Sequence, residues 1–250
     1  MSFGSFFFRK PKVHVFLRAC YYSQASAHKK RLQGFSHQRC FRNLTQTLDS
    51  KKASLTILLD TAYRENERHY VLLQKSFPVI EISEGTEAGS FLRLLDYVET
   101  LSLDEEAILY FVEDDYLHRP LWVDALLEGF SLPGPSYITL YDHRDKYLLS
   151  LYPFLTARLF HTSLTHWRTI PSTTNTYAMR CKTLKEHMQI HRAFSLNRKI
   201  TADHEKFCAL AETGALLISP IPGWSTHIDC EFLSPCIDWK KEMEEKLSEN

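Results

Sequence analysis

Glycine is scarce in this chain, and long apolar runs are missing. Only 8 of the 250 residues are glycine, which argues against a disordered or low-complexity protein. No apolar run approaches the roughly 20 residues that a membrane-spanning helix needs, so the sequence predicts no transmembrane segment. The N-terminal MSFGSFFFRKPK is too short for a secretory signal. Peripheral membrane contact through its FFFRKPK stretch is one interpretation, and a frayed arm or edge strand is the favoured one.

Paired cysteine motifs and an excess of positive charge are missing as well. The 6 cysteines are spread along the chain without a CxxC pair, which argues against a structural zinc site. Without a secretory signal, the same spread predicts reduced thiols in a cytoplasmic protein. Lys and Arg number 30, and Asp and Glu also number 30, whereas nucleic-acid binders usually carry a basic excess. The sequence therefore predicts no nucleic-acid partner.

Short apolar runs alternate with helical patterns in the first part of the chain. The runs have the length and the β-branched or aromatic composition of strands. They cover residues 13–17, 55–60, 77–83, 107–115 and 136–142. Helical patterns lie between them, with Ser36 and Ser90 as candidate N-caps. This alternation predicts an α/β fold with a mostly parallel central sheet and helices on both faces, in a single domain over residues 1–250.

The second part of the chain is less regular. Residues 157–167 alternate like one strand, and residues 173–180 are predicted as another. Residues 201–214 have a helical pattern, with Thr201 as the candidate cap and Gly214 as the stop. A strand pattern follows the glycine, and PGWSTHID (222–229) is then predicted to form a movable loop.

Three adjacent carboxylates follow a buried strand in YFVEDDYLHRP (110–120). Glu113, Asp114 and Asp115 repel one another, so a nearby cation would stabilise them, and a bound metal is one interpretation. A solvated acidic turn is the other. In an extended backbone, Glu113 and Asp115 would face one side and Asp114 the other. The pair on one side could hold Mg²⁺ or Mn²⁺ and leave positions for the oxygens of a diphosphate.

Other candidate residues lie at strand ends and in loops. Ligands of open α/β sheets bind outside the carboxyl ends of the strands, where Asp60 and Asp142 are also expected. Arg18 ends the first strand and would meet a diphosphate or form a surface salt bridge. AHKKRLQGF (27–35) would grip phosphate or form a solvated face. His227 would be a third metal ligand or an ordinary histidine.

Several of these stretches together resemble the GT-A glycosyltransferases. AILYFVEDDYLH resembles the strand and D/E-x-D motif of that family, and LTILLD resembles its second strand. ITADHEKF lies where inverting members carry the catalytic carboxylate, and PGWSTHID resembles the late loop with a metal-binding histidine. The resemblance implies a GT-A, Rossmann-like domain, with a donor-binding half at about 13–145 and an acceptor half at about 146–239.

The resemblance also implies a role for each candidate residue. Asp115 would ligate the metal, with Glu113 as a ligand through water or a contact of the ribose, and with His227 completing the metal shell. The nucleotide-binding set would be Asp60 at the base together with Arg18, Glu113 and Asp114. Asp203 would deprotonate the acceptor hydroxyl, with Glu205 as its substitute. This stretch reads ADHE instead of the usual Glu-Asp pair, so the stereochemical outcome stays open, with inversion expected.

The favoured function is therefore a metal-dependent transfer of a sugar from a nucleotide-diphosphate sugar, such as a UDP- or GDP-sugar, to an acceptor hydroxyl. A metal-dependent phosphohydrolase or nuclease is the first alternative. Two-metal hydrolases need several convergent ligands, and this sequence has only one compact acidic cluster. The second alternative is a non-catalytic protein that binds nucleotide sugars.

Overall fold

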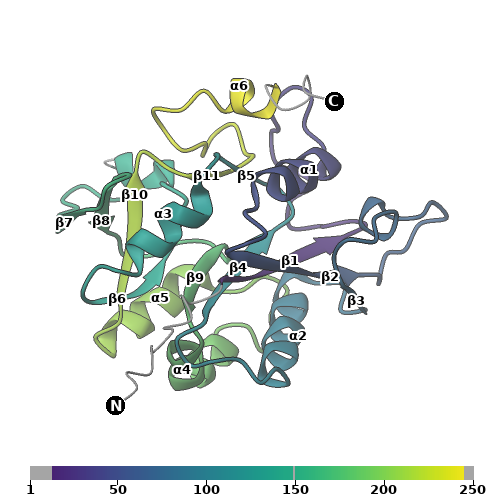
Figure 1. Cartoon of the computed structure of the whole chain (residues 1–250), viewed down its shortest axis with the longest axis horizontal. Helices are drawn as coiled ribbons and strands as arrows, with labels where there is room; N and C mark the ends of the chain where they lie inside the picture. The colour runs from purple at the N-terminus through teal and green to yellow at the C-terminus, as the bar shows by residue number, and fades with distance from the viewer. Residues whose placement is uncertain (1–12, 149, 245–250) are drawn as a thin grey trace, which may run out of the picture.

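The computed structural model describes residues 13–148 and 150–244 (Figure 1). In these residues, nine strands form one sheet in the order β3-β2-β1-β4-β9-β6-β10-β8-β7, and β5 pairs with β11 beside it. The strands of the first half are β1 (Val13–Cys20), β2 (Ala53–Asp60), β3 (Val79–Ile82), β4 (Ile108–Glu113), β5 (Tyr116–His118) and β6 (Pro135–Ile138). The later strands are β7 (Leu159–His161), β8 (His166–Thr169), β9 (Tyr177–Arg180), β10 (Leu216–Ile221) and β11 (Ser225–His227).

Four parallel strands form the regular part of the sheet. β1 lies between β2 and β4 and pairs with both in parallel, and β3 pairs in parallel with β2. The apolar runs predicted this arrangement because strands buried on both faces are hydrophobic throughout their length. The carboxyl ends of β1, β2 and β4 consequently meet at one edge, where Arg18, Asp60 and Glu113 are found.

The rest of the sheet is mixed. β9 is antiparallel to both of its neighbours, β4 and β6, while β6 is parallel to β10. β8 and β7 complete the edge in antiparallel pairings. The predicted α/β fold with a mostly parallel central sheet is confirmed, and it is Rossmann-like in its first four strands.

Helices cover both faces of the sheet, as predicted (Figure 1). The helices are α1 (His37–Thr47), α2 (Glu87–Glu99), α3 (Trp122–Gly129), α4 (Cys181–Ala193), α5 (Asp203–Glu212) and α6 (Trp239–Glu244), with short 3₁₀ helices η1 (Tyr70–Leu72) and η2 (Arg144–Tyr147). Alternate residues of β1 separate the two cores. Val15 packs in the core under α1 and α3, whereas Phe16 packs in the core under α2, α4 and α5.

One of the three predicted helix N-caps is confirmed, and two are wrong. Ser36 caps α1 as predicted, and its side chain accepts a hydrogen bond from the backbone of Arg39. Ser90 is not a cap, because α2 begins earlier and Thr86 caps it. Thr201 is not a cap either: Ala202 precedes α5, and the Thr201 hydroxyl lies 3.2 Å from that of Ser195.

Two strand and loop predictions for the second half were wrong. Residues 157–167 were expected to form one strand, but they contain β7 and the start of β8, which pair as an antiparallel hairpin. The turn between these strands is closed by a hydrogen bond from the Thr162 amide to the Thr165 carbonyl. Residues 222–229 were expected to form a loop. Residues 225–227 are instead β11, held by its ladder with β5.

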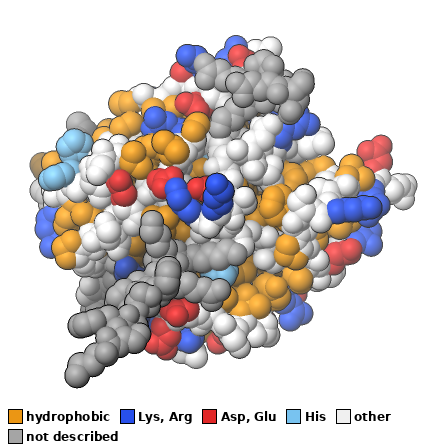
Figure 2. All heavy atoms as spheres, in the orientation of Figure 1, with side chains coloured by type: hydrophobic (Ala, Val, Ile, Leu, Met, Phe, Trp, Pro, Cys, Tyr) orange, Lys and Arg blue, Asp and Glu red, His pale blue; other side chains and the backbone are white. Residues whose placement is uncertain are grey.

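The N-terminal stretch proposed for membrane contact lies outside the described residues. Within residues 13–148 and 150–244, every helix is too short or too polar to cross a bilayer. All six cysteines fall in the described part of the chain and are free thiols. Figure 2 shows basic and acidic side chains interspersed over the visible face, in keeping with the zero formal charge.

Candidate functional site

The three adjacent carboxylates lie where β4 ends and the chain turns into β5. Glu113 is the last residue of β4, and Asp114 and Asp115 form the turn. The expected alternation therefore stops after Glu113, because the backbone is no longer extended. Each carboxylate reaches a different partner: Glu113 contacts Arg18, Asp114 contacts His37, and Asp115 contacts His227. Basic side chains of the protein thus offset the repulsion among the three neighbouring carboxylates.

Asp115 is the centre of a cluster of basic side chains. Its Oδ2 lies 2.9 Å from His227 Nε2 and accepts a hydrogen bond of 2.9 Å from Arg31 Nη2. Lys29 Nζ lies 3.2 Å from the same His227 nitrogen. Burial would raise the pKa of Asp115, but His227, Lys29 and Arg31 together hold that pKa well below its usual value. Asp115 is therefore a permanent anion at the end of β4.

The ladder between β5 and β11 positions the Asp115–His227 pair. His227 is opposite Tyr116, the neighbour of Asp115, in that ladder, and the Ile228 amide donates to the Asp115 carbonyl. Arg31 donates to the Ile228 carbonyl at 2.5 Å, which ties the 27–35 stretch to the same place. The 27–35 stretch is thus not only a solvated face, because Lys29 and Arg31 contact His227 and Asp115, while phosphate binding by this stretch stays a prediction. We name this set of Lys29, Arg31, Asp115 and His227 the basic cluster.

Glu113 and Asp114 precede Asp115 in the chain and pair with side chains outside the basic cluster. Arg18 is buried and donates to Glu113 at 3.2 Å, and its Nη2 also lies 3.0 Å from Glu87 Oε1. Burial, together with the nearby charge of Glu87, raises the pKa of Glu113. Asp114 accepts from the Cys20 amide at 3.3 Å and lies 3.1 Å from His37 Nδ1. Asp114 raises the pKa of His37 to about 9 against the opposing effect of burial.

The two other aspartates expected at strand ends have no hydrogen bond to the basic cluster. Asp60 does end β2, but the prediction for Asp142 was wrong, because β6 ends at Ile138. Asp60 accepts hydrogen bonds from the backbone amides of Ala62, Glu84 and Gly85, so its carboxylate orders the loops after β2 and β3. Asp142 is completely buried, and it accepts hydrogen bonds from Arg168 and Tyr147.

The residues predicted to bind a divalent cation fit one in part. An octahedral Mg²⁺ with ligands at roughly 2.0–2.1 Å places two adjacent donors about 2.9 Å apart. Asp115 Oδ2 and His227 Nε2 have this separation, which is also that of a hydrogen bond, and Arg31 Nη2 and Lys29 Nζ lie 2.9 Å and 3.2 Å from the same two atoms. Glu113 is not with them, because its carboxylate accepts hydrogen bonds from Arg18 and from the Thr176 hydroxyl. Among the described residues, no group of three or more His, Cys, Asp or Glu side chains is placed to hold a metal. The protein could thus supply two ligands only if Arg31 and Lys29 moved away from them, with phosphate and water completing the shell.

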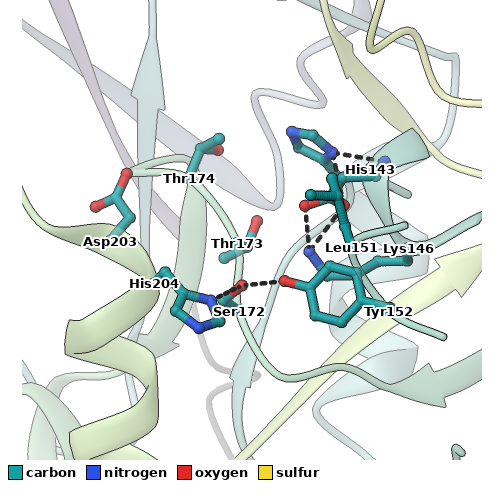
Figure 3. A pocket seen from close by; sticks show the side chains of 10 residues that line it. His143, Lys146, Leu151, Tyr152, Ser172, Thr173, Thr174, Asp203 and His204 are labelled. Atoms are coloured by element: carbon teal, nitrogen blue, oxygen red, sulfur yellow. Dashed lines mark hydrogen bonds and ion pairs between the residues drawn. The ribbon is translucent and has the colours of Figure 1, made fainter. Parts of the chain in front are cut away.

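The structure also has a cleft of about 500 Å³, and Asp203 is in its wall (Figure 3). Figure 3 shows Asp203 and His204, from the start of α5, across the cleft from His143 and Lys146. Thr174 in the wall shares a hydrogen bond of 2.7 Å with Tyr116, whose ring centroid is 5.4 Å from that of His227. The cleft and the basic cluster are therefore adjoining parts of one site.

Asp203 has the environment of a proton acceptor. Burial raises its pKa to about 6, with a further upward effect from Glu87 and a downward effect from Lys206. Its side chain is 27% exposed, so it still reaches the cleft. Glu205, the substitute candidate, is exposed and is not among the residues that line the cleft.

A buried polar chain that the sequence did not reveal joins Asp203 to the acidic motif. Lys206 is fully buried and donates to Asp203 at 3.0 Å and to Asn175, whose amide donates to Glu87 at 2.7 Å. Glu87 in turn pairs with Arg18, the partner of Glu113. The only signal for Lys206 was its spacing of three residues from Asp203 on a predicted helix. Nothing in the sequence indicated Glu87 or Asn175 as partners.

Comparisons with known proteins add information on the fold. No protein-family model matches the chain. A curated protein, the Chaperone protein HtpG of Methylorubrum populi, is 33% identical over 92 residues, which are 37% of this chain; the chain spans only 14% of that protein. A solved structure of CMP:2-keto-3-deoxy-manno-octonic acid synthetase complexed with CTP is similar over 85% of this chain and 92% of that one, with a TM-score of 0.50 and 17% identity. At this identity, the likeness shows a shared α/β fold and nothing further.

Proposed function

We propose that this protein is a glycosyltransferase that moves a sugar from a nucleotide-diphosphate sugar to an acceptor hydroxyl. The shared fold supports the broader class, because the solved synthetase was crystallised with a nucleotide and is named for a sugar acid. The observation that carries the proposal is the basic cluster. It joins Asp115 to His227, 112 residues later, and adds Lys29 and Arg31 beside a cleft that contains Asp203.

The basic cluster would bind the diphosphate. Arg presents a planar fork of donors that matches phosphate oxygens, and Lys supplies a compact positive charge. The donor's UDP or GDP would lie in the half of the chain at about 13–145, with Arg18, Asp60, Glu113 and Asp114 toward the nucleoside. Asp115 and His227 would hold Mg²⁺ or Mn²⁺, which supplies positive charge to the diphosphate when it is bound.

Asp203 would take the proton of the acceptor. The acceptor oxygen forms a bond to the anomeric carbon, the bond from that carbon to the diphosphate breaks, and the hydroxyl proton passes to the Asp203 carboxylate. A pKa of about 6 leaves Asp203 mostly ionised at neutral pH and still basic enough to accept a proton. This single displacement inverts the anomeric configuration. The acceptor would lie in the half at about 146–239, which contributes most of the cleft lining.

The two alternatives make different demands on the site. A two-metal phosphohydrolase or nuclease needs convergent ligands, and the described carboxylates of the motif instead diverge toward three different partners. A non-catalytic nucleotide-sugar-binding protein needs the basic cluster but has no use for an Asp203 with a raised pKa.

A thermal-shift screen followed by turnover assays tests the proposal. Nucleoside diphosphates and their sugars are added with and without Mn²⁺, and the matching donor should raise Tm, since ligand binding stabilises the folded state. Lys30→Ala is the matched control for Arg31→Ala, because Lys30 lies in the same stretch but is highly exposed and pairs only distantly with Glu231. The rise in Tm with donor should persist in Lys30→Ala and disappear in Arg31→Ala. The opposite result would contradict the diphosphate site. Binding without turnover of any donor would favour the non-catalytic alternative.

A further inference from the structure

Large apolar side chains are exposed along the segment that borders the cleft. Phe154 is 91% exposed and Leu151 is 57% exposed, and Tyr147 and Leu148 are also open to solvent. We name these four residues the apolar rim. Single exposed apolar residues are common, but four of them within residues 147–154 make this segment a candidate binding surface.

The apolar rim meets the cleft at Leu151. It begins at the end of η2, whose Lys146 is in the cleft wall, and Leu151 and the adjacent Tyr152 also line the cleft. Figure 3 shows Tyr152 beside Ser172 and Lys146 within this wall. The part of a bound ligand that extends out of the cleft would therefore lie next to apolar side chains.

The inner part of the cleft is polar. Ser172, Thr173 and Thr174 line it, and the Thr173 hydroxyl is buried without a hydrogen-bond partner among the described residues. A buried hydroxyl that lacks a partner is costly, so a ligand with its own hydroxyl groups would complete it. Asp203 lies in the same wall.

The charges in the cleft favour a neutral ligand. Lys146 donates to both oxygens of Asp145 at 2.8 Å, and His143 lies 2.8 Å from the same carboxylate. Lys146 is thus paired with Asp145, and Lys206 is paired with Asp203 at 3.0 Å, so neither cation is left to attract an anionic ligand. A phosphate or carboxylate beside Asp203 would be repelled.

We infer that the acceptor is a neutral glycolipid, whose sugar hydroxyls lie in the cleft at Thr173 and Asp203 and whose apolar chain lies on the apolar rim. Only the acceptor role in this inference rests on the proposed function, because binding of the glycolipid does not require the transfer step. A water-soluble sugar would leave the apolar rim uncovered, and a bare membrane surface would leave the Thr173 hydroxyl without a partner. One amphipathic ligand satisfies both.

Binding of two matched glycosides tests the apolar rim. Octyl β-glucoside below its micelle concentration should bind at least about tenfold more tightly than methyl β-glucoside, because its alkyl chain buries apolar surface. The double variant Leu151→Ser/Phe154→Ser should reduce this ratio to near one. The control Leu73→Ser, another exposed leucine, should keep it. An unchanged ratio in the double variant would overturn the inference.

The polar part of the ligand is tested separately with Thr173→Val, which keeps the shape of the side chain and removes its hydroxyl. This variant should weaken both glycosides several-fold and leave the binding of 1-octanol unchanged. If it weakens neither glycoside, or if phosphatidylcholine vesicles bind through the apolar rim more tightly than the glycosides do, the surface recognises apolar matter or membrane in general and the inference is wrong.

Failure of the proposed function would look different. In that case no nucleotide sugar is turned over, yet the preference for the octyl glycoside and its loss in the double variant persist. If instead a donor is turned over equally well with methyl and octyl acceptors, and the double variant changes neither rate, the transferase stands and the glycolipid inference is overturned.

Discussion

Asp115 is buried and Asp203 is partly exposed, and although both lie beside basic side chains, their pKa values move in opposite directions. Asp115 faces His227, Lys29 and Arg31, and its pKa is lowered. Asp203 has Lys206 on one side and Glu87 nearby, and its pKa is raised to about 6. The balance of charge around a carboxylate, rather than its burial, therefore separates a permanent anion from a group that can accept a proton.

The largest expected effect is on turnover in Asp203→Asn. Removing a general base costs roughly two or more orders of magnitude in rate, while donor binding should hardly change. The variant should also have a higher Tm at pH 7, because a raised pKa means that the charged form of Asp203 is unfavourable in the folded protein. Kinetics and thermal unfolding measure both effects. Glu205→Gln is the control, and a comparable loss of turnover there would reassign the base.

The same substitution at the other aspartate should change stability with the opposite sign. Asp115→Asn leaves Arg31 and His227 without their anion, and breaking a buried pair in this way costs about 3–5 kcal/mol. Donor binding should fall as well, since Asp115 orders the cations of the basic cluster. Urea unfolding gives the stability change. An increase in stability in Asp115→Asn would refute the contrast between the two sites.

A smaller effect is expected on the acid limb of the pH–rate profile, which reports the pKa of Asp203. Asp203 must be ionised to accept a proton, so kcat should decline as pH falls through about 6. Lys206 lowers the pKa of Asp203, and its replacement in Lys206→Met should move this limb to higher pH. Lys206 is fully buried, so Tm is recorded alongside. An acid limb that stays in place in a folded variant would show that Lys206 does not tune the base.

The smallest expected effect is the pH dependence of stability from His37. Its pKa is raised to about 9 in the folded protein by Asp114, so the stabilisation is complete below about pH 6.5 and is lost as pH rises through 9. The His37 side chain is 35% exposed, and solvent screening keeps this contribution modest. In His37→Gln the decline in the free energy of unfolding between pH 6.5 and 9 should become shallower. Identical slopes would remove His37 as the cause.

The fold could be predicted from the sequence where strand and helix patterns were local. The runs that became β1, β2 and β4 are apolar throughout, and Ser36 stands directly before its helix. The second half was harder because β7 and β8 look like one alternating strand until their turn is known. Ser90 was mistaken for a cap because Thr86, four residues earlier, serves equally well.

The candidate site was predictable as a set of residues but not as a network. The sequence indicated Asp115, His227 and Asp203, and the structure places the first two in contact and the third in a cleft. Their role in catalysis stays a prediction. The partners Glu87 and Lys206 come from helices whose position relative to β1 and β9 depends on tertiary packing, and no local pattern carries that information.

The contact between Asp115 and His227 also has a consequence for the order in which the protein is made. At 5–20 residues per second, a ribosome needs about 6 to 22 seconds to add the 112 residues between them. Arg31 is synthesised before Asp115, so its hydrogen bond to Asp115 joins two residues that are already made when this interval begins. The basic cluster is completed only later, when β11 has been made and can pair with β5.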